Sequence, residues 1–188
     1  MQAKKKNLVI ERGAMFIPLR FIISVMIMAI IFSVFFAGFK YASRVIAEKN
    51  VERECNELIG EISTMVASGN SRDIYDKNIL KGDTRTKELK FPDELIYIGF
   101  GTDPDANNDG ILEGGLLCNG SCIVYKVDGF SKKYIWLDEN IKFRKGIKKN
   151  GIWTIKSPPQ GYVLVGGGKF ELNFELVNKN SEKYVLIY

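Results

Sequence analysis

The longest apolar run in the sequence lies near its N-terminus, from Phe21 to Phe39, and contains no charged residue. As a helix it would span about 28 Å, close to the thickness of the hydrocarbon core of a bilayer. The main alternative is a cleaved secretory signal, whose apolar region is usually about 7–15 residues long. The run is longer than that, no small-x-small cleavage site follows it, and it is apolar on every face, unlike a helix that covers one side of a soluble core. The pattern therefore predicts a retained transmembrane helix over residues 21–39.

The charges on either side of this run predict its orientation. Residues 1–20 form a short basic leader that contains Lys4–Lys6 and Arg12, whereas Lys40 and Arg44 follow the run. Basic flanks tend to stay in the cytoplasm, and the leader holds more of them. We therefore expect a single-pass protein of the cell membrane, with a cytoplasmic N-terminus and an extracellular C-terminal domain.

Beyond the apolar run, hydrophobic residues continue at helical spacing through residues 40–69. The positions of this stripe, three or four residues apart, are Val51, Cys55, Leu58, Ile62 and Met65. Such a stripe is one face of an amphipathic helix, and Gly69-Asn70 is a C-terminal stop signal. We expect one helix from about residue 18 to about residue 68, whose C-terminal half packs on the domain that follows.

From Leu89 onward the pattern changes to short runs rich in β-branched and aromatic residues, such as ELIYIGF, CIVYKV and KYVLIY. Turn residues separate these runs, and Asn150-Gly151 is the strongest hairpin signal among them. Strands at this spacing predict an antiparallel β-sandwich or a barrel-like sheet within residues 70–188. The expected fold class is α+β, with a long N-terminal helix, transmembrane and then amphipathic, before the β domain.

Composition narrows the range of functions. The chain has no histidine, which removes Ser-His-Asp and Cys-His catalysis and every His-ligated metal site. The net charge is +5, but residues 40–188 hold 22 of the 27 basic and 21 of the 22 acidic residues. A nearly neutral exterior domain gives no reason to expect a nucleic acid partner. No carboxylate pair, nucleophile–base pair or cofactor motif stands out, so we expect neither an enzyme nor a small-molecule substrate.

The sharpest local motif lies between two of the expected strands and is similar to the first part of an EF-hand-type calcium loop. Oxygen ligands alternate in such loops because the chain wraps around a hard cation, and a glycine at position 6 permits the sharp turn. The residues at positions 1, 3, 5, 7 and 9 are Asp105, Asn107, Asp109, Ile111 (through its carbonyl) and Glu113, with Gly110 at position 6. Leu116 replaces the bidentate Glu of position 12, and Asp103 is a candidate substitute from upstream. The alternative is a polar surface loop; the candidate cofactor is calcium, in a site weaker than a full EF-hand.

Two cysteines and a glycosylation sequon follow this loop. Cys118 and Cys122 frame the segment CNGSC, which a tight turn at Asn119-Gly120 could close into a small disulfide ring, as an exterior domain allows. Two unpaired thiols are the alternative. Asn119 also begins the N-x-S/T sequon of the chain and is a candidate glycosylation site. Cys55 lies on the apolar stripe and is expected to be a small buried residue.

The layout resembles that of type IV pilin-like proteins, and among them the archaeal ones. The matching features are the short basic leader, Arg12-Gly13 just before the apolar run, the long helix, and the β domain after it. The resemblance covers the whole chain by layout and residues 4–39 by motif. It implies cleavage of the leader between Gly13 and Ala14, after which the apolar helix becomes the part that assembles with other pilin-like subunits.

These observations favour a pilin-like, membrane-anchored surface protein with a structural or adhesive role. One alternative is a stand-alone anchored extracellular binding module that is stabilised by calcium and never polymerises. A second, less favoured alternative is an anchored enzyme accessory. Processing at Gly13 would favour the first reading, whereas an intact N-terminus would favour the stand-alone module.

Overall fold

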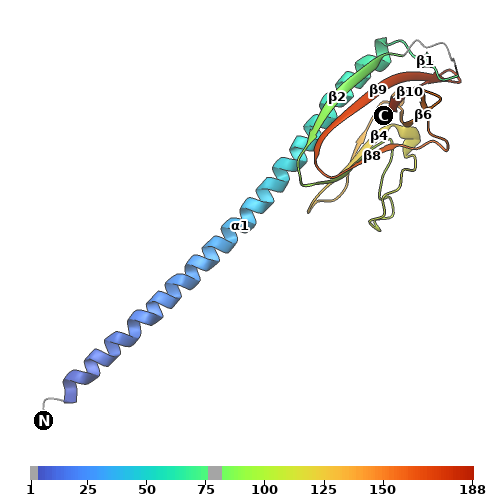
Figure 1. Ribbon diagram of the computed structural model, residues 1–188. Helices are drawn as coiled ribbons and strands as arrows, with labels where there is room; N and C mark the ends of the chain where they lie inside the picture. The colour runs from blue at the N-terminus through green and yellow to red at the C-terminus, as the bar shows by residue number, and fades with distance from the viewer. Residues whose placement is uncertain (1–3, 76–81) are drawn as a thin grey trace. The chain divides into compact units, whose positions relative to one another are not determined.

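The computed structural model describes residues 4–75 and 82–188, with side chains from residue 19 onward. The predicted cleavage site, Gly13-Ala14, therefore lies outside the residues whose side chains are described. The chain forms two compact units, Met1–Ser43 and Arg44–Tyr188, called here the N-terminal and the C-terminal unit. A long apolar helix precedes a β-rich domain, so the predicted α+β fold class is confirmed (Figure 1).

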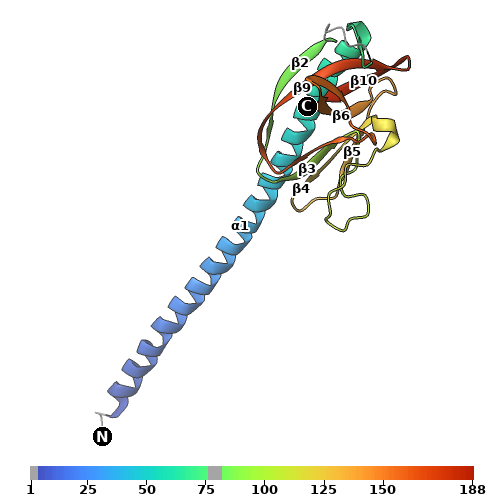
Figure 2. The same cartoon turned by 45° about the vertical axis from the view of Figure 1, so that its right-hand side comes forward.

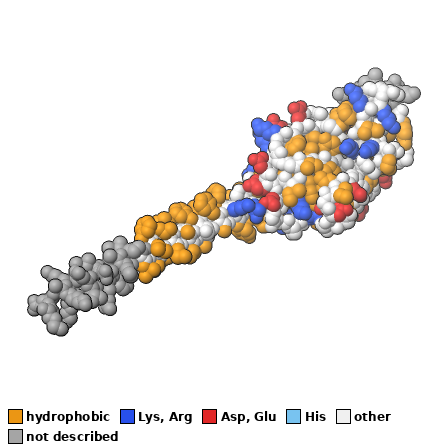
Figure 3. Space-filling model, turned by 60° about the horizontal axis from the view of Figure 1, so that its bottom comes forward, with side chains coloured by type: hydrophobic (Ala, Val, Ile, Leu, Met, Phe, Trp, Pro, Cys, Tyr) orange, Lys and Arg blue, Asp and Glu red, His pale blue; other side chains and the backbone are white. Residues whose placement is uncertain are grey.

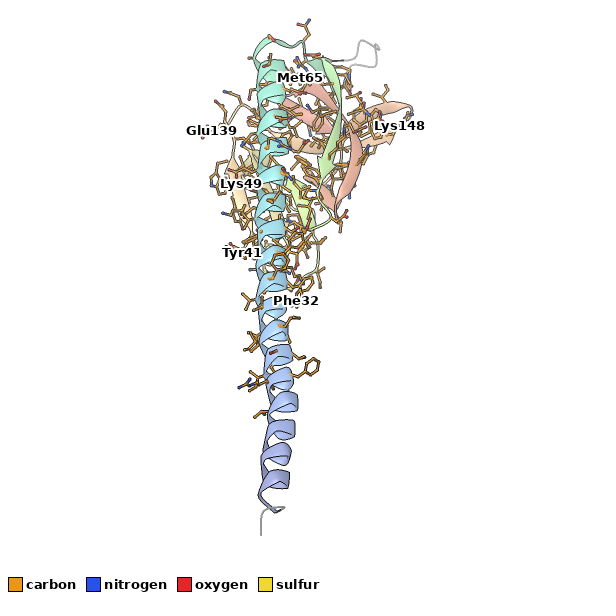
Figure 4. The ribbon with its side chains drawn as sticks, turned by 90° about the vertical axis from the view of Figure 1, so that its left-hand side faces the viewer. Phe32, Tyr41, Lys49, Met65, Glu139 and Lys148 are labelled. Carbon is orange, nitrogen blue, oxygen red and sulfur yellow. The ribbon has the colours of Figure 1, made fainter. Side chains whose placement is uncertain are left out.

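Helix α1 (Lys4–Ser68) begins in the N-terminal unit and ends in the C-terminal unit. Among the described residues, it is the one helix long and apolar enough to cross a membrane. The large hydrophobic side chains of its apolar run are exposed on all sides, with Phe21 at 70% and Phe39 at 68%, and side chains such as Phe32 project outward from the helix (Figure 4). The hydroxyls of Ser24 and Ser33 donate to helix carbonyls four residues earlier, at 2.9 and 2.8 Å, so neither needs a partner in lipid. This part of α1 is consistent with a single-pass membrane anchor.

The C-terminal unit contains two β-sheets. The bounds of the strands in the first sheet are β1 (Arg72–Asp73), β2 (Thr84–Phe91), β6 (Phe143–Lys149), β7 (Ile152–Ile155), β9 (Gly168–Lys179) and β10 (Glu182–Ile187). Those in the second are β3 (Leu95–Phe100), β4 (Cys122–Val127), β5 (Lys133–Trp136) and β8 (Tyr162–Val165). The first sheet has the order β1-β9-β10-β6-β7, with β2 also paired to β9, and the second has the order β5-β4-β3-β8. Figure 2 labels β2, β6, β9 and β10 of the first sheet and β3, β4 and β5 of the second.

The second sheet is antiparallel throughout, as predicted, whereas the first is mixed. Asn150 and Gly151 take φ of 50° and 82° in the predicted tight turn between β6 and β7. A similar turn at Asn180 and Ser181, with φ of 54° and 66°, folds β10 back along β9. The other edge of β10 then pairs with β6 in the parallel direction, and β1 also runs parallel to β9. These two parallel pairings correct the expectation of a purely antiparallel domain.

The hydrophobic core of the C-terminal unit lies between α1 and the inner faces of both sheets. The predicted helix stripe is buried there, since Val51, Cys55, Leu58, Ile62 and Met65 are each at most 1% exposed. Inner residues of the first sheet, such as Phe174, and of the second, such as Phe100, complete the core. The views in Figures 1 and 2 agree in placing the C-terminal part of α1 beside β2 and β9. The amphipathic half of the helix is therefore part of the domain core, as its spacing predicted.

Candidate functional site

The candidate calcium ligands lie in the loop between β3 and the short 3₁₀ helix η1 (Cys118–Gly120). Gly101 begins this 101–117 loop with φ of 74°, and a Cβ atom there would come within 3.0 Å of Gly120 and of the Phe143 carbonyl oxygen. The Leu117 amide donates to the Gly101 carbonyl at 3.0 Å and closes the loop. The backbone hydrogen bond therefore holds the ends of the loop together, while the positive φ and the close approach of neighbouring backbone favour glycine at position 101.

Asp103 is held by groups from a distant part of the chain. Its Oδ2 atom accepts hydrogen bonds from Lys132 Nζ and from the Tyr134 hydroxyl, both at 2.8 Å. Lys132 Nζ also donates to the Asp105 carbonyl oxygen at 2.6 Å. Burial raises the pKa of Asp103, but hydrogen bonds from Lys132, Tyr134 and the Asp105 amide lower it by more, so its net pKa lies below the usual value. The ammonium of Lys132 thus supplies a positive charge at the start of the loop.

The middle of the loop is organised by its own hydrogen bonds. Asp105 Oδ1 accepts from the Gly110 amide at 3.1 Å, and Asp109 Oδ1 accepts from the Ile111 amide at 2.7 Å. The Asn107 side-chain amide donates to Asp109 Oδ2 at 2.8 Å. Asp105 is buried, whereas the three predicted side-chain ligands beyond it, Asn107, Asp109 and Glu113, are exposed.

The predicted ligands are therefore not drawn together around one point. Among residues 19–75 and 82–188, whose side chains are described, no three His, Cys, Asp or Glu residues are grouped so that they could hold a metal ion. Asp103 is turned toward Lys132, Asp109 toward the amides of Asn107 and Ile111, and the Ile111 side chain is 65% exposed. The structure gives no support to the calcium site, and calcium binding stays a prediction.

The structure also gives no support to the predicted Cys118–Cys122 disulfide, because all three cysteines are free thiols. Cys118 is exposed at φ of 45°, whereas Cys122 is buried at the start of β4, with its Sγ atom 3.7 Å from the Leu117 carbonyl oxygen. Burial raises the pKa of the Cys122 thiol to about 12, and that of the Cys55 thiol likewise to about 12. Cys55 is buried in the core, as expected.

Asn119 is exposed, in the left-handed region with φ of 50°. Arg144 Nη2 donates to Asn119 Oδ1 at 2.6 Å, and Arg144 Nη1 donates to the Asn119 carbonyl oxygen at 3.0 Å. The bond to the side chain uses its oxygen, whereas a glycan would be attached to its nitrogen. Glycosylation of Asn119 stays a prediction.

Sequence reasoning missed Lys132, Tyr134 and Arg144, which position the candidate site residues. Lys132 and Tyr134 lie 29 and 31 positions beyond Asp103, and Arg144 lies 25 positions beyond Asn119. No local motif links residues so far apart, since Lys132 and Tyr134 lie next to or in β5 of the second sheet and Arg144 lies on β6 of the first.

Comparison with known proteins adds no relative: no family model, curated protein or solved structure matches the chain.

Proposed function

We propose that the chain is a pilin-like subunit of the cell surface, anchored in the membrane before assembly and structural or adhesive in role. The observation that carries this proposal is the division of α1 into two different surfaces. Its apolar run is exposed all round, with Ile31 at 63% and Phe35 at 65%, whereas its later stripe is buried in the C-terminal unit, with Ile62 at 0%. The stripe fixes the helix to its own domain, and the apolar run is left to bind something else.

An exposed apolar helix of this kind needs either lipid or other apolar helices around it. In a bilayer, lipid satisfies it, and helices gain little from hydrophobicity by associating there. Outside the bilayer, burial against neighbouring copies would stabilise it by roughly 25 cal/mol per Å² of apolar surface. Contacts that repeat from subunit to subunit without closing generate helical filaments. The same segment can therefore serve first as an anchor and then as the core of a filament.

The sequence supplies the supporting detail for orientation and processing. The basic leader favours a cytoplasmic N-terminus and an extracellular C-terminal unit. The proposed cleavage between Gly13 and Ala14 would remove most of that leader and start the mature chain close to the apolar run. The pilin-like proteins that the chain is proposed to belong with are the archaeal ones.

Cell fractionation tests the proposal. Native cells are sheared, membranes are removed by ultracentrifugation, and the protein is quantified in the membrane-free surface fraction. We expect part of it there, and we expect Gly13→Val to abolish this fraction because a bulky side chain obstructs the peptidase. Gly13→Ala is the matched control and should retain the fraction. Confinement of the wild-type protein to membranes would contradict the proposal.

A second candidate function is the stand-alone anchored binding module stabilised by calcium. The sequence motif from Asp105 to Glu113 favours it, because alternating oxygen side chains with a glycine at position 6 are typical of calcium loops. It requires that the protein stay in the membrane with its N-terminus intact. It also requires a higher melting temperature in calcium than in a chelator, since an ion that binds only the folded state stabilises it.

A further inference from the structure

Two exposed aromatic residues lie on the outer face of the second sheet. Tyr134 pairs with Val124 and Trp136 with Cys122, and paired residues point to the same side of a sheet. The residue between these two on β4, Ile123, belongs to the core, so both aromatic rings lie on the face away from it. Tyr134 is 40% and Trp136 60% exposed, and their rings stack with centroids 5.6 Å apart and planes 13° apart. Figure 3 shows hydrophobic side chains gathered on a face of the C-terminal unit.

The tyrosine of this pair is held in position by hydrogen bonding. The Tyr134 hydroxyl donates to Asp103 Oδ2, and the same oxygen accepts from Lys132 Nζ. The side chains of Lys132 and Asp103 are only 11% and 8% exposed, so this support is shielded from water. Trp136 therefore presents an exposed indole against a ring that cannot easily move. A rigid aromatic side chain loses little conformational entropy when a ligand binds to it.

A hollow of about 210 Å³ in the 101–117 loop adjoins Tyr134 through Asp103, which lines the hollow and accepts the hydrogen bond of the Tyr134 hydroxyl. Its lining combines polar side chains, such as Asn107 and Glu113, with apolar ones, such as Ile111 and Leu116. Ligand pockets for drug-sized molecules measure about 300–1,000 Å³. This hollow is smaller and suits a single ring-sized group of a longer ligand.

We propose that this surface, the Tyr134–Trp136 pair with the adjoining hollow, binds a neutral carbohydrate chain. A sugar ring has an apolar face of C–H groups that packs on an aromatic ring, and a rim of hydroxyls that donate to carboxylate and amide oxygens. The exposed carboxylate of Glu113 in the lining disfavours an anionic sugar. Carbohydrate would then be the ligand class for the adhesive role proposed above. This inference rests on the proposed function only in placing the surface outside the cell.

Indole fluorescence provides a direct test, because the chain has two tryptophans. In the full-length protein in detergent, Trp153→Phe leaves Trp136 as the single indole. It is titrated with laminarin, yeast mannan and arabinogalactan as neutral probes, and with polygalacturonate as an anionic probe. We expect a saturable change in Trp136 emission with at least one neutral probe and a weaker response to polygalacturonate. In pull-down by the same immobilised polysaccharide, Trp136→Ala should lower affinity by about tenfold or more, the equivalent of about 1.4 kcal/mol.

Trp153→Ala is the matched control, because Trp153 also stacks on a tyrosine, Tyr188, but in the first sheet, with centroids 4.1 Å apart. It should retain polysaccharide binding. Binding of Trp136→Ala equal to that of the wild type, or no binding of the wild type to any neutral probe, would overturn the inference. Self-association that depends on Trp136, without polysaccharide binding, would also overturn it and assign the surface to a second copy of the chain. Trp136→Ala should fractionate between membrane and surface as the wild type does, so failure here is distinguishable from failure of the filament proposal.

Discussion

Replacing Ile62 with alanine tests whether the amphipathic half of α1 belongs to the core of the C-terminal unit. Ile62 is 0% exposed and packs in the cluster that joins α1 to both sheets. Truncation of a buried isoleucine to alanine costs about 2–5 kcal/mol, because it removes buried methyl groups and leaves a cavity. For a domain of this size, each kcal/mol lowers the melting temperature by about 2–4 °C. We therefore expect a fall of about 4–20 °C.

The control is the same substitution at an exposed position of the same helix. Ile46 is 61% exposed, so Ile46→Ala should change the stability by no more than about 0.5 kcal/mol. Thermal unfolding in detergent is followed by tryptophan fluorescence, since both tryptophans lie in the C-terminal unit, whereas far-ultraviolet circular dichroism would be dominated by the apolar helix. Equal effects of the two substitutions would refute the assignment of the stripe to the core.

Three further predictions concern the 101–117 loop and the cysteines. Iodoacetamide should modify Cys118 in the folded protein but neither Cys55 nor Cys122. Both of these thiols are buried, and their raised pKa values keep them protonated. Mass mapping that finds Cys118 joined to Cys122 would contradict this prediction. The pKa of Asp103 is lower in the folded protein than in the unfolded chain. The Asp103 carboxylate therefore contributes its full stabilisation above the unfolded pKa of about 3.9, and this stabilisation is lost as the pH falls through the folded pKa. In urea unfolding, the free energy of unfolding of Asp103→Asn should therefore fall less between pH 7 and pH 3 than that of the wild type. Equal decreases would contradict this role of Asp103. Chelation should lower the melting temperature, and Asp109→Ala should abolish that difference; identical melting curves in calcium and chelator would leave the loop a plain turn.

The features that sequence reasoning predicted correctly are those set by local periodicity. The stripe from Val51 to Met65 repeats every three or four residues, so any packing against a sheet must bury that face. The apolar run is apolar on all sides, and its exposure in the structure follows from that. Asn150-Gly151 gave a hairpin because both residues accept positive φ at little cost.

The features that sequence reasoning missed depend on contacts between distant segments. Nothing in the sequence near β10 shows that it pairs in parallel with β6, because this pairing follows from the order of strands across the sheet. The calcium motif was recognised from residue types alone, whereas Lys132, which directly precedes β5, holds Asp103. The disulfide expectation relied on spacing alone, whereas backbone conformation leaves Cys118 exposed and Cys122 buried.

The mass of the mature protein distinguishes a processed filament subunit from an unprocessed membrane anchor. Intact-protein mass spectrometry is applied to native protein from sheared, membrane-free surface material and from membranes of the same cells. We expect the surface form to begin at Ala14 and to lack residues 1–13. A single form that keeps residues 1–13 and occurs only in membranes would contradict it and would leave the stand-alone anchored module in its place.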